Sequence, residues 1–234
     1  MKDSIPRHAL RLYLIRHGEV EHSYHQVFSG GRIDMNLSPL GHQHAADVAE
    51  WFGEHPLDAV YVSPMKRAQQ TAAPLLAARQ ITPSIVDALR EVDFGDWTGS
   101  RWHEIQEKFG VDAYDWLEVM EKGAVPNGES ALTLANRLRP AVQSILNHNA
   151  DRSVAIVCHG GIIRGILSLL LELPLSFTSH MNIDYGSVTM LELQPAKKHI
   201  VEIELLNFCP GTDRIGPRAL TSERSSKGLR APTK

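Results

Sequence analysis

Short runs of apolar residues recur along the chain, and most are followed by a segment with helical periodicity. Three of the runs, 10–15 (LRLYLI), 58–62 (DAVYV) and 153–158 (SVAIVC), have the length and residue types of buried strands. Residues 186–193 and 199–206 alternate apolar and polar residues, which indicates two further strands, and residues 83–86 are a weaker strand candidate. The strands predicted are therefore residues 10–15, 58–62, 83–86, 153–158, 186–193 and 199–206.

Between these runs, apolar residues spaced three to four positions apart indicate helices. Ser-Pro begins two of them, at 38–39 and 63–64, which predicts Ser as the N-cap and Pro at the first helical position. Strands that alternate with helices predict a three-layer αβα sandwich with a mostly parallel central sheet. The predicted helices are residues 38–52, 63–79, 129–148 and 162–171, with short pieces at 101–109 and 112–121.

A chain of 234 residues suits one large domain, and we expect residues 1–211 to form it. Within it, residues 92–126 are rich in aromatics and glycine, and we expect them to form an excursion over the sheet edge that carries the active site. Residues 212–234 hold six basic and two acidic residues without apolar periodicity, which predicts a disordered basic tail.

Composition excludes several classes of protein. With 43% hydrophobic residues, 22% charged residues and a net charge of -3, the chain is neither broadly disordered nor a strongly basic nucleic-acid binder. The longest apolar region, 162–175, is broken by Arg164 and Glu172, so we expect no membrane span. The two cysteines cannot make a disulfide scaffold, and the short apolar run at 10–15 does not suit a signal peptide, so a cytoplasmic protein is the simplest interpretation.

Three predicted strands end in residues suited to binding an anion. After the first strand come Arg16 and His17. A histidine there can be a neutral nucleophile if one ring nitrogen is held by an acceptor, and the arginine fork suits a phosphate or carboxylate. Taken alone, the pair could also be a surface feature. Ligands gather at the carboxyl ends of strands in such folds, which favours a site.

The other two strand ends add to this pattern. Arg67 falls in the first turn of a predicted helix, whose N-terminus already favours anions. His159 and Gly160 follow the most strand-like run and open another helix, which makes a second anion cradle, although His159 could instead be a satisfied core histidine. Glu91 heads an aromatic and glycine-rich turn, where apolar surroundings favour a carboxyl that donates protons near neutral pH. We take Cys158 to be an inert strand thiol.

Five motifs occur in the order found in the histidine phosphatase superfamily, the phosphoglycerate mutase-like enzymes, and the chain resembles that family from about residue 10 to 208. They are Arg-His-Gly-Glu at 16–19, Ser-Pro-Met-Lys-Arg-Ala-Gln-Gln-Thr at 63–71, Leu-Arg-Glu-Val-Asp-Phe-Gly-Asp-Trp-Thr-Gly at 89–99, Asn-Gly-Glu-Ser at 127–130 with Arg137, and His-Gly-Gly at 159–161.

The resemblance implies roles for the matching residues. His17 would be the nucleophile that carries the phosphoryl group, and Arg16, Arg67 and His159 would surround that group. Glu91 would act first as general acid and then as general base. Phosphoryl transfer requires positioning and neutralised charge, which two arginines and a histidine can supply, so we expect no metal and no other cofactor.

Departures from the family pattern favour its phosphatase branch. Val20 replaces a common hydroxyl residue, and Ser23 stands where the mutases have Asn. The mutases' Glu-Arg-His-Tyr-Gly sequence and paired arginines are missing. The loop at 28–30 is similar to that of the phosphatases. We predict that substrate is bound by Ser23, Ser29, Gly30 and Gly160, and that His22, His25, Arg32 and Trp97 could reach the leaving group.

The leading hypothesis is thus a metal-independent phosphomonoesterase that hydrolyses a small phosphorylated metabolite, such as alpha-ribazole phosphate or a sugar phosphate, through phosphohistidine. A phosphoglycerate mutase is the alternative enzyme, and a non-catalytic module that binds a phosphorylated ligand is an alternative of another class. We expect a small phosphorylated substrate as the partner, with neither nucleic acid nor membrane, and the sequence leaves a homodimer open.

Overall fold

A six-stranded mixed sheet forms the centre of the computed structural model, which describes residues 9–194 and 200–211. Its strand order is β3-β2-β4-β1-β5-β6. The first four strands in this order are parallel, whereas β5 pairs antiparallel with both β1 and β6. The sheet is therefore mostly parallel, as predicted. The strands are β1 Leu10–Arg16, β2 Ala59–Val62, β3 Ser84–Ile85, β4 Ser153–Cys158, β5 Val188–Gln194 and β6 Ile200–Phe208.

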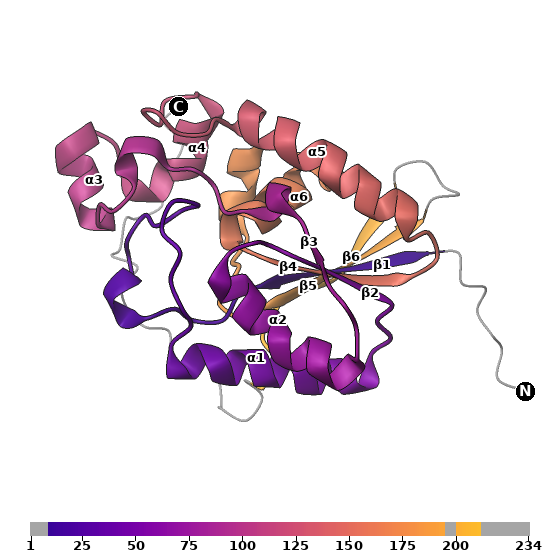
Figure 1. Cartoon of the computed structure of the whole chain (residues 1–234). Helices are drawn as coiled ribbons and strands as arrows, with labels where there is room; N and C mark the ends of the chain where they lie inside the picture. Colours follow the sequence, from indigo (N-terminus) through magenta and orange to yellow (C-terminus); the bar gives the residue numbers. More distant parts are fainter. Residues whose placement is uncertain (1–8, 195–199, 212–234) are drawn as a thin grey trace, which may run out of the picture.

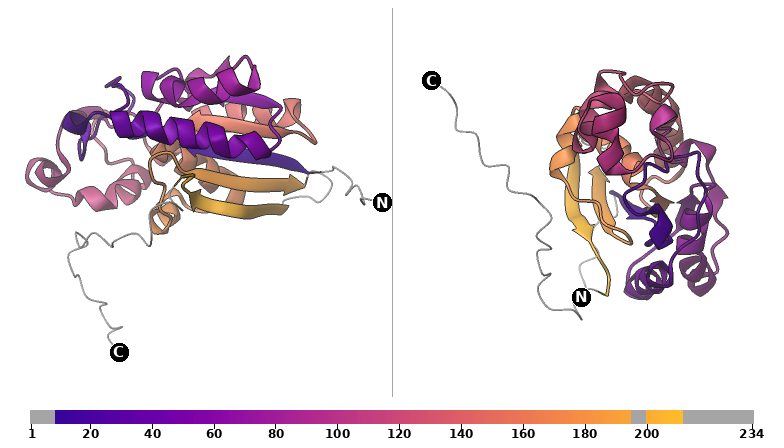
Figure 2. Two further views of the ribbon diagram at one scale, coloured as in Figure 1. Left: turned by 90° about the horizontal axis from the view of Figure 1, so that it is seen from below. Right: turned by 90° about the vertical axis from the view of Figure 1, so that its left-hand side faces the viewer.

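Helices cover both faces of this sheet, which confirms the αβα sandwich. α1 and α2 lie on one face, and α5 and α6 lie on the other (Figures 1 and 2). The α-helices are α1 Pro39–Trp51, α2 Lys66–Arg79, α3 Trp102–Phe109, α4 Trp116–Glu121, α5 Ala131–His148 and α6 Gly160–Leu171. Short 3-10 helices span His22–Tyr24, Phe52–Glu54, Asp87–Leu89, Gly95–Trp97, Ala113–Asp115 and Leu175–His180.

The central strands β1 and β4 are mostly apolar because both of their faces are covered. In β1, Leu12 and Leu14 pack with the α5 and α6 side of the core, whereas Tyr13 and Ile15 pack with the α1 and α2 side. Every residue of β4 is buried. A strand with helices on both faces loses the alternation of apolar and polar residues, which explains why β1 and β4 form nearly unbroken apolar runs in the sequence.

The two Ser-Pro signals have different structural meanings. Ser38 caps α1 as predicted, because its hydroxyl accepts a hydrogen bond from Gly41 N at 3.0 Å and Pro39 is the first helical residue. The prediction for Ser63 was wrong. α2 begins later, at Lys66, after Met65 as the N-cap, and that N-cap has no side-chain hydrogen bond. The Ser63 hydroxyl is bonded to a histidine described below.

Within the segment 92–126, the two predicted helical pieces correspond to α3 and to the 3-10 turn followed by α4. Figure 1 shows α3 and α4 together at one end of the molecule, beyond the start of α5. The assignment of residues 1–211 to a single domain stays a prediction, and the predicted tail at 212–234 lies outside the described residues. No helix in the described ranges is both long enough and apolar enough to cross a membrane.

Candidate active site

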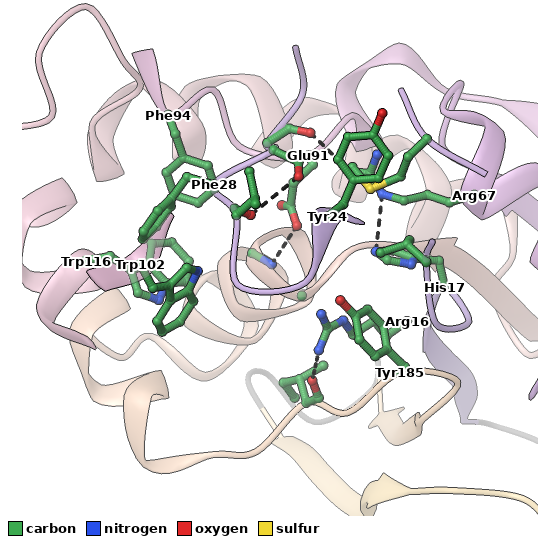
Figure 3. A pocket seen from close by; sticks show the side chains of 18 of the residues that line it. Arg16, His17, Tyr24, Phe28, Arg67, Glu91, Phe94, Trp102, Trp116 and Tyr185 are labelled. Atoms are coloured by element: carbon green, nitrogen blue, oxygen red, sulfur yellow. Dashed lines mark hydrogen bonds between the residues drawn. The ribbon is translucent and has the colours of Figure 1, made fainter. Parts of the chain in front are cut away.

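The carboxyl ends of three neighbouring parallel strands open into one cleft (Figure 3). β1 ends at Arg16 and is followed by His17, β4 is followed by His159, and the turn after β2 leads to Arg67 at the start of α2. Because β2, β4 and β1 are adjacent in the sheet, these residues meet although they lie far apart in the sequence. Arg16, His17 and Arg67 line the cleft together with Glu91.

His17 is held with one ring nitrogen free of its proton. Its Nδ1 lies 2.8 Å from the carbonyl oxygen of Gly18, and since a carbonyl only accepts, Nδ1 carries the proton. Nε2 then accepts a hydrogen bond from Arg67 Nε at 3.2 Å. Burial, followed by the charges of Arg67 and Arg16, holds the pKa of His17 well below its usual value. His17 is therefore neutral at physiological pH, and its unprotonated Nε2 is engaged by Arg67 in this structure.

Arg67 connects the two histidines. Its Nε also donates to Nδ1 of His159 at 3.1 Å, while its terminal nitrogens donate to the carbonyl oxygens of Ile33 and Gly30 at 3.2 and 3.1 Å. These four contacts fix the plane of a guanidinium that is almost fully buried. Burial lowers the pKa of Arg67, and the negative charge of Glu91 opposes this effect.

His159 lies beneath Arg67, fully buried, and is not among the residues that line the cleft. Since its Nδ1 accepts from Arg67, the neutral ring carries its proton on Nε2 and donates to the Ser63 hydroxyl at 2.7 Å. Burial and the nearby Arg67 hold the pKa of His159 well below its usual value. In this structure His159 supports Arg67, and a ligand in the cleft would meet Arg67 before it meets His159.

Arg16 offers a donor to the cleft. One terminal nitrogen donates to the carbonyl oxygen of Ile183 at 2.6 Å, and the guanidinium lies 4.0 Å from the centre of the Tyr185 ring. Its Nε is buried and has no hydrogen-bond partner among the described residues. An unsatisfied buried donor is costly, and a phosphate oxygen beside Gly160 could accept from it.

Glu91 faces the cleft from the loop that follows the 3-10 turn Asp87–Leu89. Its Oε1 accepts from Val92 N at 2.9 Å, and its Oε2 accepts from Gly161 N, at the start of α6, at 3.3 Å. Figure 3 places Glu91 between the cluster of Arg16, His17 and Arg67 on one side and several aromatic side chains on the other. The Glu91 carboxyl therefore separates a basic part of the cleft from an aromatic part.

The family model of the histidine phosphatase superfamily (branch 1) matches residues 12–205. Phosphoserine phosphatase 1 of Hydrogenobacter thermophilus is 26% identical over 84% of this chain and 92% of its own. The adenosylcobalamin/alpha-ribazole phosphatase of Escherichia coli is 24% identical over 79% and 90%. A solved structure of mycobacterial glucosyl-3-phosphoglycerate phosphatase superposes with a TM-score of 0.76, is 27% identical, and covers 86% of this chain and 99% of its own.

The chain belongs to the histidine phosphatase superfamily. It is an enzyme of the phosphatase class, and its relatives support a small phosphorylated metabolite as substrate.

The predicted substrate-binding residues of this histidine phosphatase are not all at the cleft. Ser29, Gly30 and Gly160 line it, and the carbonyl of Gly30 also orients Arg67. Ser23 is exposed and is not among the lining residues. The reason is local, because the 3-10 turn His22–Tyr24 turns Ser23 outward and brings its neighbour Tyr24 to the cleft instead.

The four residues expected near the leaving group do not line the cleft either. Trp97 is completely buried, and Arg32 is paired with Asp93, Nε to Oδ1, at 2.6 Å. His25 Nε2 donates to the carbonyl oxygen of Val20 at 3.0 Å, and the His22 ring packs against the His25 ring. In their place, the structure brings in lining residues that sequence analysis did not single out: Tyr24, Phe94, Trp102, Trp116, Arg164 and Tyr185.

A sequence signal existed for only some of these. The abundance of aromatics in 92–126 was visible, but a buried core explains such a pattern equally well. Arg164 was visible as a charge within an apolar helix, one turn after Gly160. Among the described residues, no three His, Cys, Asp or Glu side chains are grouped so that they could hold a metal ion.

Proposed function

We propose that this histidine phosphatase is a metal-independent phosphomonoesterase, which hydrolyses a small phosphorylated metabolite through a phosphohistidine on His17. The observation that carries the proposal is the orientation of His17. Its Nδ1 proton is directed to Gly18 O, so the lone pair of Nε2 lies beside Arg67 Nε, 3.2 Å away, in the cleft. A nucleophile held next to a fixed cation suits attack on an anionic phosphoryl group.

In the first step, Nε2 of His17 bonds to phosphorus while the bond between phosphorus and the leaving oxygen breaks. Protonated Glu91 gives its proton to that oxygen, and the alcohol leaves. The attack releases Nε2 from its hydrogen bond with Arg67 Nε. The unpartnered Nε–H of Arg16 donates to an equatorial oxygen, and the buried guanidinium charge of Arg67 beside His17 offsets the negative charge spread over these oxygens. This step needs no mobile counterion, because both guanidiniums are fixed by hydrogen bonds before substrate binds.

In the second step, the Glu91 carboxylate takes a proton from water as the water oxygen bonds to phosphorus. The bond between phosphorus and Nε2 breaks, inorganic phosphate leaves, and Glu91 is again protonated. Relatives support hydrolysis as the overall outcome, since their names describe phosphatases. The mycobacterial glucosyl-3-phosphoglycerate phosphatase has also been solved in complex with VO3, an oxyanion of the kind that mimics a transferring phosphoryl group.

The experiment is to mix the enzyme with a 32P-labelled alkyl phosphate, quench in alkali within milliseconds, and look for protein-bound label that is stable in alkali and lost in acid. His17→Asn is the test variant, because Asn keeps an amide donor for Gly18 O but has no ring lone pair. We expect labelled wild type, an unlabelled variant and no turnover by the variant. Substantial turnover by His17→Asn would refute the covalent mechanism.

The same assay with 3-phosphoglycerate separates the alternatives. Release of inorganic phosphate without formation of 2-phosphoglycerate supports the phosphatase. Rapid interconversion of the two phosphoglycerates would identify a mutase. Binding without either reaction, and without label on His17, would identify a non-catalytic module.

A further inference from the structure

The cleft has two chemically different ends, and Glu91 lies between them (Figure 3). Arg16, His17 and Arg67 form the end that suits a phosphoryl group. Since Glu91 must reach the leaving oxygen to protonate it, the remainder of the leaving group lies beyond Glu91, toward the opposite end. The substrate's alcohol portion therefore meets the second end of the cleft, whichever alcohol it is. This step rests on the proposed function.

Four aromatic side chains, which we call the aromatic wall, line that second end: Phe28, Phe94, Trp102 and Trp116. Phe28 and Trp102 are stacked with 5.2 Å between ring centres and 15° between planes. Phe94 meets Phe28 edge to face at 4.9 Å and Trp116 edge to face at 5.3 Å. The rings thus support one another in preferred pair geometries, and the wall is formed before any ligand arrives.

Backbone contacts hold the wall in place. Trp102 and Trp116 are the first residues of α3 and α4, whereas Phe28 belongs to the loop after β1. The amide of Trp102 donates to the carbonyl oxygen of Gln26 at 2.8 Å, and the amide of Phe28 donates to that of Ser100 at 3.0 Å. Both tryptophans line the cleft and remain partly exposed. One face of Trp102 is covered by Phe28, and Trp116 has no stacked neighbour among the described rings.

The other lining residues indicate which leaving group fits. Among the described residues that line the cleft, Glu91 is the only carboxylic acid, and its oxygens are already held by Val92 N and Gly161 N. A leaving group with an ammonium would have this one carboxyl as its acidic partner, shared with the leaving oxygen, and would also face Arg16 and Arg164. A sugar with many hydroxyls would need more polar side chains than the wall offers. A planar aromatic ring needs neither.

We propose that the aromatic wall is the leaving-group subsite of this enzyme, and that its substrates are phosphomonoesters of alcohols bearing a planar aromatic or heteroaromatic ring. The ring stacks against Trp102 or Trp116 while the phosphoryl group lies at His17. Stacking of a ring on an aromatic side chain changes affinity by about 5- to 150-fold when the side chain is removed.

Two primary alkyl phosphates test the subsite without changing the chemistry. 2-Phenylethyl and 2-cyclohexylethyl phosphate have the same chain length and alkoxides of similar basicity, and the cyclohexyl compound is the more hydrophobic. If stacking selects the substrate, kcat/KM is at least about fivefold higher for the phenyl compound. Equal values, or a preference for cyclohexyl, would overturn the proposal, because the wall would then only exclude water.

Substitutions locate the effect. Trp116→Leu and Trp102→Leu keep apolar bulk but remove the flat face, so the ratio of phenyl to cyclohexyl kcat/KM should fall toward one in at least one of them. Phe177→Leu is the matched control, because Phe177 is an aromatic residue with 47% exposure that is not among the cleft-lining residues. It should leave the ratio and the turnover unchanged. A ratio unaltered by both tryptophan variants would also overturn the proposal.

Binding of phosphonates separates this proposal from the proposed function. Calorimetry of wild-type protein with 3-phenylpropyl and 3-cyclohexylpropyl phosphonate measures the preference without any reaction and without any variant that could fail to fold. Tighter binding of the phenyl compound by at least about fivefold supports the subsite even if no phosphohistidine forms. If the enzyme turns over substrate and phosphohistidine is trapped, but the phenyl and cyclohexyl compounds bind equally well, the proposed phosphatase function is supported and the aromatic subsite is rejected.

Discussion

Arg137 donates two parallel hydrogen bonds to the carboxylate of Glu129, from Nε to Oε1 at 2.7 Å and from a terminal nitrogen to Oε2 at 2.8 Å. The pair also holds the loop on both sides of Glu91. Arg137 donates to the carbonyl oxygen of Arg90 at 3.0 Å, and Glu129 accepts from the amide of Asp93 at 2.9 Å. The backbone that carries the proposed general acid is therefore clamped immediately before and two residues after Glu91.

Because Arg137 holds the loop that carries Glu91, we expect Arg137→Lys to weaken general acid catalysis by Glu91, although Arg137 does not line the cleft. Lysine keeps the charge but cannot reproduce the two-pronged contact or the bond to Arg90 O. We expect a loss of about 1–3 kcal/mol in the free energy of unfolding, since backbone carbonyls lose their donor. We also expect kcat to fall more for an alkyl phosphate than for nitrophenyl phosphate, whose leaving group needs little protonation.

Arg139→Lys is the matched control, because Arg139 is exposed on the same helix. Chemical denaturation and the two kcat values measure both effects. A fall in kcat of equal size for both substrates would show that Arg137 supports the fold in general and has no specific effect on Glu91.

A substitution at Gly161 is a second way to displace the Glu91 carboxyl. A Cβ at Gly161 would lie 2.6 Å from Glu91 Oε1 and 2.8 Å from Val92 Cγ2, so Gly161→Ala must move the carboxyl. At the neighbouring Gly160 the nearest atom is Arg16 Nε, at an ordinary 3.5 Å. We expect Gly161→Ala to reduce kcat for alkyl phosphates by at least about tenfold, within the range that general acid catalysis supplies, and Gly160→Ala to cause a smaller loss. Equal losses in the two variants would contradict this account.

The two buried histidines predict how stability depends on pH. Burial comes first, and the arginine charges second, among the causes that hold the pKa values of His17 and His159 well below the unfolded value. Between the folded and unfolded pKa values the unfolded chain binds more protons, so their contribution to stability is complete above about pH 6.5 and declines as pH falls. The slope reaches about 1.4 kcal/mol per pH unit for each histidine.

Denaturant titrations from pH 7.5 to pH 5 measure this slope. Carboxylates also titrate, so the informative quantity is the difference between wild type and His17→Asn, for which we expect a shallower decline below pH 6.5. A variant with the same slope as wild type would show that His17 takes up its proton equally in the folded and unfolded chains, so that folding does not lower its pKa.

The layers of the fold and the residues at the strand ends can be predicted from the sequence, because each depends on a short stretch of neighbouring residues. Strands covered on both faces must be apolar, and an anion site at a strand end needs Arg, His and Gly in short motifs, so β1, β4 and residues 16–19 are recognisable without coordinates. Ser63 shows the limit. Its Ser-Pro signal is identical to that at Ser38, and only the tertiary contact with His159 distinguishes the two.

The aromatic wall could not be predicted for a similar reason. Trp97, Trp102 and Trp116 lie in one segment rich in aromatic residues. The structure buries Trp97 completely and brings the other two to the cleft. Trp102, the first residue of α3, stacks on Phe28, and Trp116, the first residue of α4, packs on Phe94. Which tryptophan meets the ligand depends on this packing between distant segments, which leaves no local mark in the sequence.

Removal of metal ions tests the source of the positive charge. If the guanidiniums of Arg16 and Arg67 neutralise the phosphoryl oxygens, activity survives excess EDTA, and vanadate inhibits by binding beside His17. Dialysis against EDTA followed by an assay with and without added Mg²⁺ or Zn²⁺ measures this. Loss of activity that either cation restores would refute the metal-independent mechanism.

Glu91→Gln separates the two proposed roles of Glu91. Gln keeps the size and can still accept from Gly161 N, but it cannot deliver a proton. An alkoxide is a strong base and needs that proton as it leaves, whereas nitrophenolate leaves without help. General acid catalysis contributes roughly 10²- to 10⁴-fold, so phosphorylation of His17 by an alkyl phosphate should slow by about that factor.

With nitrophenyl phosphate, the phosphorylation of His17 should remain fast in this variant. The second step is common to both substrates and uses Glu91 as the base, so water then attacks slowly and phosphohistidine accumulates. Stopped-flow measurement should show a burst of nitrophenol close to one equivalent of enzyme, followed by slow turnover, and alkaline quenching should trap the label on His17. If phosphorylation slows equally for both substrates and no burst appears, Glu91 only shapes the cleft, and the proton must come from another group.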